Sequence, residues 1–394
     1  MIRKMSADIL DELEIRDIDV DAKVSGVPLA QRQLVEIAKA LSHDLKVLIL
    51  DEPTAPLTNE DTAHLFEILK HIRSRGVSII FITHRLKEVL TYCDRGTILR
   101  NGKTVESVRI SDIDESSLIE LMIGQKAEGF YRASDASGAA GKGSEAILKV
   151  EHLSIGDKVH DIGFQLHRGE IVGVTGLLGA GQNEMARSLF GIQDGASVLI
   201  ELKGRRIRIR SPKEAVENGI CLLTENRKEE GLVLGMSVKE NITLPSLRRF
   251  NRSRLFPFIH NGNERRAAQN FIDKVNIVVR SPNSKIRTLS GGNQQKSIVA
   301  RWLLRSLEIL IFIEPTRGID VGAKAEIYRL LISLASEGKS IMVVSTDHNE
   351  ILGISDRIFV MYKGRLSSII PHAEANEEVL LSAIQGWSTD AQSE

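Results

Sequence analysis

The sequence predicts an α/β protein built on parallel β-sheets, and three observations support this fold class. Short apolar runs without polar alternation, such as 309–313 and 77–82, are typical of strands buried on both faces. These runs alternate with segments of helical periodicity. A glycine-rich loop, 176–183, follows an apolar strand and precedes a helix. Strand, helix and strand in this order predict parallel pairing.

Composition limits the class of protein further. The chain has 394 residues, of which 42% are apolar, enough for two buried cores. Lysine plus arginine and aspartate plus glutamate both number 52, so we expect no nucleic-acid partner. Cys93 and Cys221 lack metal-ligand spacing. No signal peptide and no apolar run of about 18 residues occurs, so we expect no transmembrane segment.

The chain repeats itself at an offset of 262 residues, the separation of Glu52 and Glu314. At this offset Asp94 meets Asp356. The repeat predicts a partial first copy at 1–125, a linker at 126–145 rich in glycine, serine and alanine, a complete second copy at 146–380 and a tail at 381–394.

Each copy has a predicted order of elements. In the first copy we expect helices at 31–41 and 58–73 and buried strands at 46–50 and 77–82. The second copy is predicted to begin with strands at 147–153 and 169–175, the glycine-rich loop, and a helix from Glu184. Residues 204–210 (GRRIRIR) alternate basic and apolar side chains, which predicts an edge strand with a solvated basic face.

Ser290, Gly291 and Gly292 open an apolar-periodic run, so bare backbone N–H groups are expected at a helix N-terminus, where anions bind. With these residues the stretch 289–295 (LSGGNQQ) resembles the signature motif of the ATP-binding cassette (ABC) family, and 311–316 (IFIEPT) resembles its Walker B segment. The alternative is a capped helix and a core strand. The resemblance implies P-loop NTPase cassettes, one partial and one complete, with a mixed sheet and helical subdomains.

The resemblance also assigns the P-loop of the second copy. Gly176, Gly179 and Gly181 have the spacing that wraps phosphates with backbone N–H groups. Gln182 stands where the family has lysine, and Asn183 where it has serine or threonine. We therefore expect weak nucleotide binding here, and the alternative is a turn kept for packing.

Walker B and switch residues differ between the copies. By resemblance, Asp51 would position Mg²⁺ through a water molecule, Glu52 would polarise the attacking water and His84 would contact the γ-phosphate of ATP. In the second copy Ile313 replaces the aspartate, Thr346 replaces the histidine and only Glu314 remains.

Signature residues show the opposite division, because the first copy has Pro28 at the serine position. In the family each ATP site combines the P-loop, Walker B and switch residues of one cassette with the signature of the other. The resemblance thus implies one competent site and one degenerate site. The nucleotide-binding residues it implies are Ser290, Gly291, Gly292, Gln294, Gly176, Gly179, Gly181, Gln182, Asn183, Glu225 and Glu314.

The first copy starts only about 25 residues before its signature position, and no GxxxxGK[ST] occurs in the chain. We therefore interpret the chain as N-terminally truncated, with uncovered apolar sheet edges. Whether this chain hydrolyses ATP is left open.

Two more segments resemble one branch of the family. Residues 223–232 (LTENRKEEGL) and 315–324 (PTRGIDVGAK) are similar to stretches of tandem ATPases that import ribose, galactose, xylose, arabinose or autoinducer-2. This implies ATP and Mg²⁺ as cofactors, two integral-membrane permease subunits and a periplasmic sugar-binding protein as partners, and the cytoplasmic face of the bacterial inner membrane as the location. The insert 231–258 would lie near the permease, or be a solvated loop.

Three alternatives to sugar import remain. The chain could be an inactive truncated remnant, a regulatory subunit that binds nucleotide, or a soluble tandem ABC protein of translation or DNA repair. The near-neutral linker argues against the last of these, because such proteins usually carry a basic interdomain segment.

Overall fold

The structure, a computed structural model, describes residues 2–13, 15, 18–43, 45–54, 57, 59–83, 85–100, 102–123, 145–251 and 259–386. It divides into two compact units, Met1–Ala127 and Glu128–Glu394. His84, nearly all of the predicted linker and the last eight residues of the predicted tail lie outside the described residues. Within the described part of the tail, helix α13 (Glu377–Ile384) continues past position 381.

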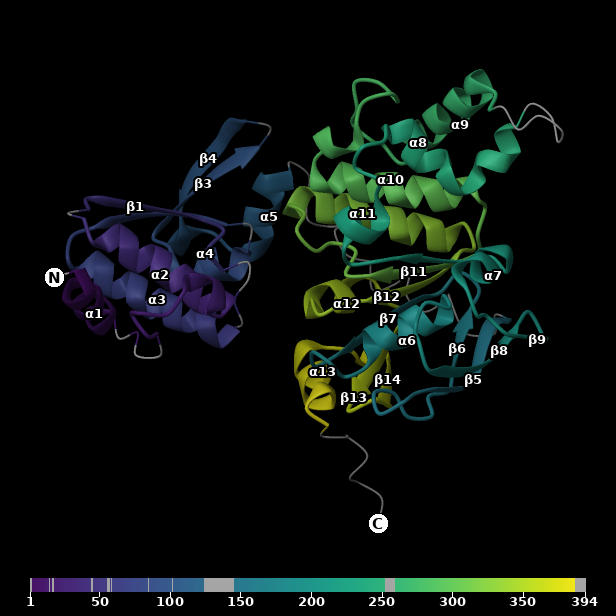
Figure 1. Ribbon diagram of the computed structural model, residues 1–394, viewed down its shortest axis with the longest axis horizontal. Coiled ribbons are helices and arrows are strands. Elements are labelled where there is room, and N and C mark those ends of the chain that lie inside the picture. Colours follow the sequence, from purple (N-terminus) through teal and green to yellow (C-terminus); the bar gives the residue numbers. More distant parts are fainter. Residues whose placement is uncertain are drawn as a thin grey trace, which may run out of the picture. The chain divides into compact units, whose positions relative to one another are not determined.

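The first unit has a two-stranded parallel sheet with helices packed on one face (Figure 1). Strand β1 pairs with β2 in the register Val47 to Ser78. The predicted helices and strands of this copy are confirmed within one or two residues, apart from His84 and other positions outside the description. The elements are α1 (Ile2–Glu12), η1 (Val24–Gly26), α2 (Leu29–Leu41), β1 (Val47–Asp51), α3 (Asn59–Ser74), β2 (Ser78–Ile82), α4 (Leu86–Tyr92), β3 (Arg95–Arg100), β4 (Lys103–Arg109), η2 (Ile110–Asp112) and α5 (Glu115–Ile123).

The opposite face of this sheet is uncovered, which corrects one prediction. Apolar side chains on it are 47–63% exposed: Val47, Ile49, Ile80 and Ile82. The prediction that both strands are buried on both faces is therefore wrong, because no described segment packs on that side. The uncovered apolar surface expected for the first copy is a sheet face as well as an edge.

The second unit contains a six-stranded mixed sheet in the order β10-β11-β12-β7-β13-β14, of which only β14 is antiparallel. A separate antiparallel sheet has the order β6-β5-β8-β9. Strand β9 (Arg205–Ile207) lies at its edge with exposed arginines, which confirms the predicted basic edge strand. The strands are β5 (Ala146–Ile155), β6 (Phe164–His167), β7 (Ile171–Gly176), β8 (Ala196–Leu202), β10 (Ile220–Leu223), β11 (Ile309–Ile313), β12 (Ser340–Val344), β13 (Arg357–Tyr362) and β14 (Arg365–Pro371).

Helices surround the six-stranded sheet, and a helical part built from α8, α9 and α10 stands beside it (Figure 1). The main core joins both sheets with α6, and Phe359 is among its largest fully buried side chains. The fold is therefore α/β with a helical subdomain, as predicted. The helices are α6 (Gln182–Leu189), α7 (Pro212–Glu217), the π-helical turn η3 (Arg227–Gly231), α8 (Val238–Thr243), η4 (Leu244–Phe250), α9 (Asn261–Lys274), η5 (Ile286–Thr288), α10 (Gly291–Leu304), α11 (Val321–Ser336), α12 (His348–Ile354) and η6 (His372–Glu374).

Candidate functional site

The glycine-rich loop of the second copy connects β7 to α6, as the sequence predicts. Gly179 and Gly181 have φ angles of 84° and 101°, a left-handed backbone that side chains other than glycine rarely adopt. At Gly176 a Cβ atom would lie 2.4 Å from the carbonyl oxygen of Met361. The loop thus has the strand, turn and helix geometry that exposes backbone N–H groups to phosphate.

Gln182 turns back onto this loop. Its side chain is buried, and its Nε2 donates to the carbonyl oxygen of Leu177 at 3.3 Å. Asn183, beside it at the start of α6, is half-buried. The loop therefore offers neutral amides where a lysine would offer a positive charge, so it lacks the charge-assisted contact to phosphate.

The Walker B strand of the second copy, β11, ends at Ile313, which is buried in the core. Glu314 follows with a φ of 48°, its N–H donates to Val344, and its Oε1 accepts from the N–H of Thr346 at 2.8 Å. Burial raises the pKa of Glu314, and hydrogen bonds from Thr346 oppose the rise. No metal-binding cluster of His, Cys, Asp or Glu occurs among the described residues.

The Walker B strand of the first copy ends in the same backbone conformation as that of the second, but with an aspartate in place of Ile313. Asp51 is the last residue of β1 and is exposed. Glu52 has a φ of 45° and its N–H donates to Ile82 at 2.8 Å, as Glu314 donates to Val344. The two carboxylates predicted for catalysis therefore stand together at the carboxyl end of a parallel strand, where α/β proteins place their reactive groups.

The signature helix α10 begins without a capping side chain. Ser290 is its N-cap residue, yet the Ser290 hydroxyl accepts from Nδ2 of Asn293 and forms no bond to a backbone N–H of the first turn. Uncapped N–H groups and the helix dipole favour an anion here. Gln294 is buried, and its amide donates to the carbonyl of Leu289 at 3.2 Å. In the first unit, Pro28 is the corresponding N-cap residue and is exposed.

Glu225 lies on the segment between β10 and η3. Its carboxylate forms an ion pair with Arg317 at 3.5 Å. The desolvation cost of this ion pair is small, because the Arg317 side chain is 68% exposed. The contact links the 223–232 segment to the loop after β11, which the sequence does not predict.

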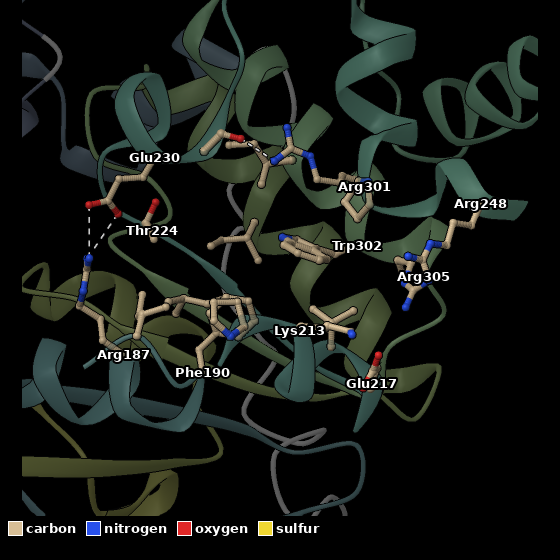
Figure 2. A pocket seen from close by; sticks show the side chains of 18 residues that line it. Arg187, Phe190, Lys213, Glu217, Thr224, Glu230, Arg248, Arg301, Trp302 and Arg305 are labelled. Carbon is tan, nitrogen blue, oxygen red and sulfur yellow. Dashed lines mark hydrogen bonds and ion pairs between the residues drawn. The ribbon is translucent and has the colours of Figure 1, made fainter. Parts of the chain in front are cut away.

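A cleft of about 780 Å³ lies between the sheet and the helical part of the second unit (Figure 2). Arg301 is largely buried beside it and donates from Nη1 to Gly231 and from Nε to Asn241, and burial lowers its pKa to about 10. The cleft is lined by Arg187, Phe190, Ile192, Pro212, Lys213, Val216, Glu217, Leu222, Leu223, Thr224, Glu230, Gly231, Pro245, Arg248, Ile298, Arg301, Trp302 and Arg305.

Three polar groups of this cleft have no hydrogen-bond partner among the described residues: Oγ1 of Thr224, Nε1 of Trp302 and Nε of Arg305, all buried. In Figure 2, Arg248 and Arg305 lie close together on one side of the cleft, and the ion pair of Arg187 with Glu230 lies on the other side. No motif or periodicity in the sequence predicts this cleft. The available signal was the cationic and aromatic side chains at the C-terminal end of α10, Arg301, Trp302 and the C-cap residue Arg305, after an apolar stretch at 298–300.

Comparisons with known proteins agree with this geometry. A family model for the ABC transporter matches residues 159–317. The ribose import ATP-binding protein RbsA of Clostridium perfringens is 42% identical over 370 residues, which cover 94% of this chain and 72% of that protein. A protein of Agrobacterium fabrum, named for import of ribose, galactose or methyl galactoside, is 42% identical over 98% of this chain and 75% of its own length.

Solved structures show the same fold. A nucleotide-free ATP-binding cassette from an ABC transporter covers 61% of this chain and 96% of its own, with a TM-score of 0.51 and 17% identity. The cbiO1 protein of Clostridium perfringens covers 61% of this chain and 94% of its own, with a TM-score of 0.51 and 21% identity. These likenesses show the P-loop fold of an ATP-binding cassette.

The chain belongs to the ABC transporter family, and within it to the ATP-binding proteins of sugar importers. ATP is the nucleotide of this family. No described helix is long and apolar enough to cross a membrane.

Proposed function

We propose that the chain is the ATP-binding subunit of a sugar importer in which hydrolysis depends on Asp51, Glu52 and His84 of the first copy and on the signature of the second. The observation that carries this proposal is the contrast at the end of the two Walker B strands. Both strands place a glutamate in the same left-handed backbone, but only the first has an aspartate before it. We therefore assign ATP hydrolysis to the first copy.

Mg²⁺ fits the first copy and does not fit the second. Asp51 offers an exposed carboxylate at the end of β1, where it would hold the hydrated ion through a water molecule. The ion would neutralise charge on the phosphate oxygens. Ile313 offers no oxygen at the corresponding position and is buried. Glu52 would then polarise the attacking water, and His84 would contact the terminal phosphate.

The remaining nucleotide contacts are part of the same proposal. Ser290, Gly291 and Gly292 would bind phosphate oxygens with the uncapped N–H groups of α10. Gln294 lies in the same helix, and Glu225 forms an ion pair with Arg317 of the loop after β11. The loop with Gly176, Gly179 and Gly181 would hold nucleotide weakly through Gln182 and Asn183, and Glu314 would not hydrolyse it.

The cleft of the second unit is the proposed docking site for the integral-membrane permease subunits. Its apolar lining includes Phe190 and Trp302, and its cations outnumber its acids. The unpartnered donors on Trp302 and Arg305 can bond to acceptors on a permease segment. In this role the chain would have a periplasmic sugar-binding protein as a further partner, and it would lie at the cytoplasmic face of the bacterial inner membrane.

The test compares Glu52→Gln with Glu314→Gln. Each substitution keeps the shape of the side chain and removes the carboxylate. ATP hydrolysis and sugar uptake should be abolished by Glu52→Gln and little changed by Glu314→Gln. Equal losses from both variants would contradict the proposal, and a wild-type chain without any hydrolysis would favour a regulatory or inactive role.

A further inference from the structure

Arg227 is the first residue of the π-helical turn η3, but its side chain leaves this turn and reaches the loop after β11. Nη1 donates to the carbonyl oxygen of Arg317 at 2.8 Å, and Nη2 donates to that of Gly318 at 2.9 Å. Both acceptors are backbone atoms on neighbouring residues. The planar guanidinium can make two such bonds at once, which a lysine ammonium cannot do with the same geometry.

The same guanidinium lies against the start of the signature helix. A Cβ atom built on Gly291 would be 2.7 Å from Nη2 of Arg227 and 3.1 Å from the carbonyl oxygen of Gly318. Gly318 has a φ of 65°, so the loop turns sharply at this point. Arg227 therefore packs between the loop 317–318 and the backbone of Gly291.

Burial makes this contact costly to lose. Arg227 is half-buried, and burial lowers its pKa, so the charged group depends on its carbonyl partners. A second link joins the same segments, because Glu225 pairs with Arg317. This ion pair is largely exposed and contributes little by itself.

We propose that Arg227 is a positioning residue for the signature motif. It fixes the loop 317–318 and, through that loop and its own contact, the backbone of Gly291 whose N–H faces the anion site. This inference rests on the proposed function, because it matters for ATP only if the signature of the second copy binds nucleotide. The inference also assigns a role to the 223–232 segment, the positioning of the signature motif, which its sequence resemblance alone does not indicate.

The first experiment measures the contact without nucleotide. Amide hydrogen exchange is followed in the full chain for Arg227→Lys and for Arg187→Lys. Arg187 is a matched control, since it also donates from both guanidinium nitrogens to η3, through Glu230, but has no bond to the loop 317–318. Arg227→Lys should raise exchange at 316–323 and 291–294 at least severalfold, and Arg187→Lys should not. Equal exchange in the wild type and Arg227→Lys would overturn the proposal.

The second experiment measures MgATP binding by the full chain. Arg227→Lys should raise the half-saturating MgATP concentration about tenfold, as expected for the loss of one charge-assisted hydrogen bond. The control is Arg206→Lys, because Arg206 pairs with Glu151 on the edge strand β9. Faster exchange with unchanged MgATP binding would reduce Arg227 to a structural role and overturn the proposal. A wild-type chain that binds no MgATP would refute the proposed function, while the exchange contrast would still be present.

Discussion

Ile49 and Ile311 occupy the same position of the internal repeat, yet the side chain of Ile49 is 63% exposed and that of Ile311 is 0% exposed. Ile311 lies in a core cluster together with Val174 of β7 and Met185 of α6. No described segment supplies the corresponding cover in the first unit. The corresponding strands β1 and β11 therefore have one buried face in the first copy and two in the second.

Substitutions at these two positions should differ in their effect on stability. Ile311→Ala should lower the free energy of unfolding by about 3 to 4 kcal/mol, because it removes buried methylene groups and leaves a cavity. Ile49→Ala should change it by less than about 1 kcal/mol, because the side chain is exposed in the folded state. Urea denaturation of the full chain measures both. A loss at Ile49 as large as at Ile311 would show that its face is covered.

Sequence patterns could predict the helices and strands but not which faces of the strands are covered by other segments. The runs 47–50 and 309–313 are both entirely apolar, so the pattern predicts that both strands are buried on both faces. Burial depends on what packs against a strand, and a local pattern does not contain that information. The glycine-rich loop and the signature helix were predicted correctly, because the φ angles of Gly179 and Gly181 and the small residues at the start of α10 depend on local geometry.

Contacts between distant segments could not be predicted in this way. Arg227 and Gly318 are 91 residues apart in the sequence, and Arg301 and Gly231 are 70 residues apart. Each arginine donates to a backbone carbonyl, which leaves no mark in the sequence of its partner. The charged residues of the candidate site were therefore found only where a family motif names them.

The pH dependence of stability should depend on Glu350 of α12. Burial raises its pKa to about 7 from an ordinary value of 4.5, with the charge of Asp347 adding to the rise. The folded state thus favours the protonated carboxyl. The stability that this provides is complete below about pH 4.5 and is lost as the pH rises through 7, a change on the order of 3 kcal/mol.

Glu350→Gln should remove this dependence and make the protein more stable than the wild type at pH 8. Urea denaturation at pH 5 and pH 8 measures the difference. Glu308→Gln is the control: a hydrogen bond from Lys203 lowers the pKa of Glu308, so its stabilisation is lost only at more acidic pH. A pH 5 to pH 8 difference that survives in Glu350→Gln would contradict the assignment.

The proposed permease cleft predicts that charge at Arg305 matters for assembly. Arg305→Glu should abolish co-purification of the chain with its permease subunits, because an acidic group would replace a buried donor without a partner among the described residues. Arg206→Glu, which places the same change on the solvated edge strand β9, should leave assembly intact. Retained assembly with Arg305→Glu would exclude this cleft as the docking site.

The second P-loop predicts a gain of nucleotide binding from one substitution. Gln182→Lys places a positive charge at the start of α6, beside glycines that already have the left-handed backbone of a phosphate loop. The charge-assisted contact should strengthen ATP binding by about 2 kcal/mol, or roughly thirtyfold. Hydrolysis should not increase, because Ile313 still supplies no oxygen for Mg²⁺.

Calorimetric titration with ATP measures this gain against a matched control. Gln165→Lys adds the same charge at an exposed position of β6, away from the loop. Stronger binding by both variants would indicate a general electrostatic effect, whereas stronger binding by Gln182→Lys alone would show that only the side chain separates this loop from a working phosphate site. Unchanged affinity in Gln182→Lys would mean that the loop is kept for packing, since Gly176 and Gly181 have neighbours that leave no room for a Cβ atom.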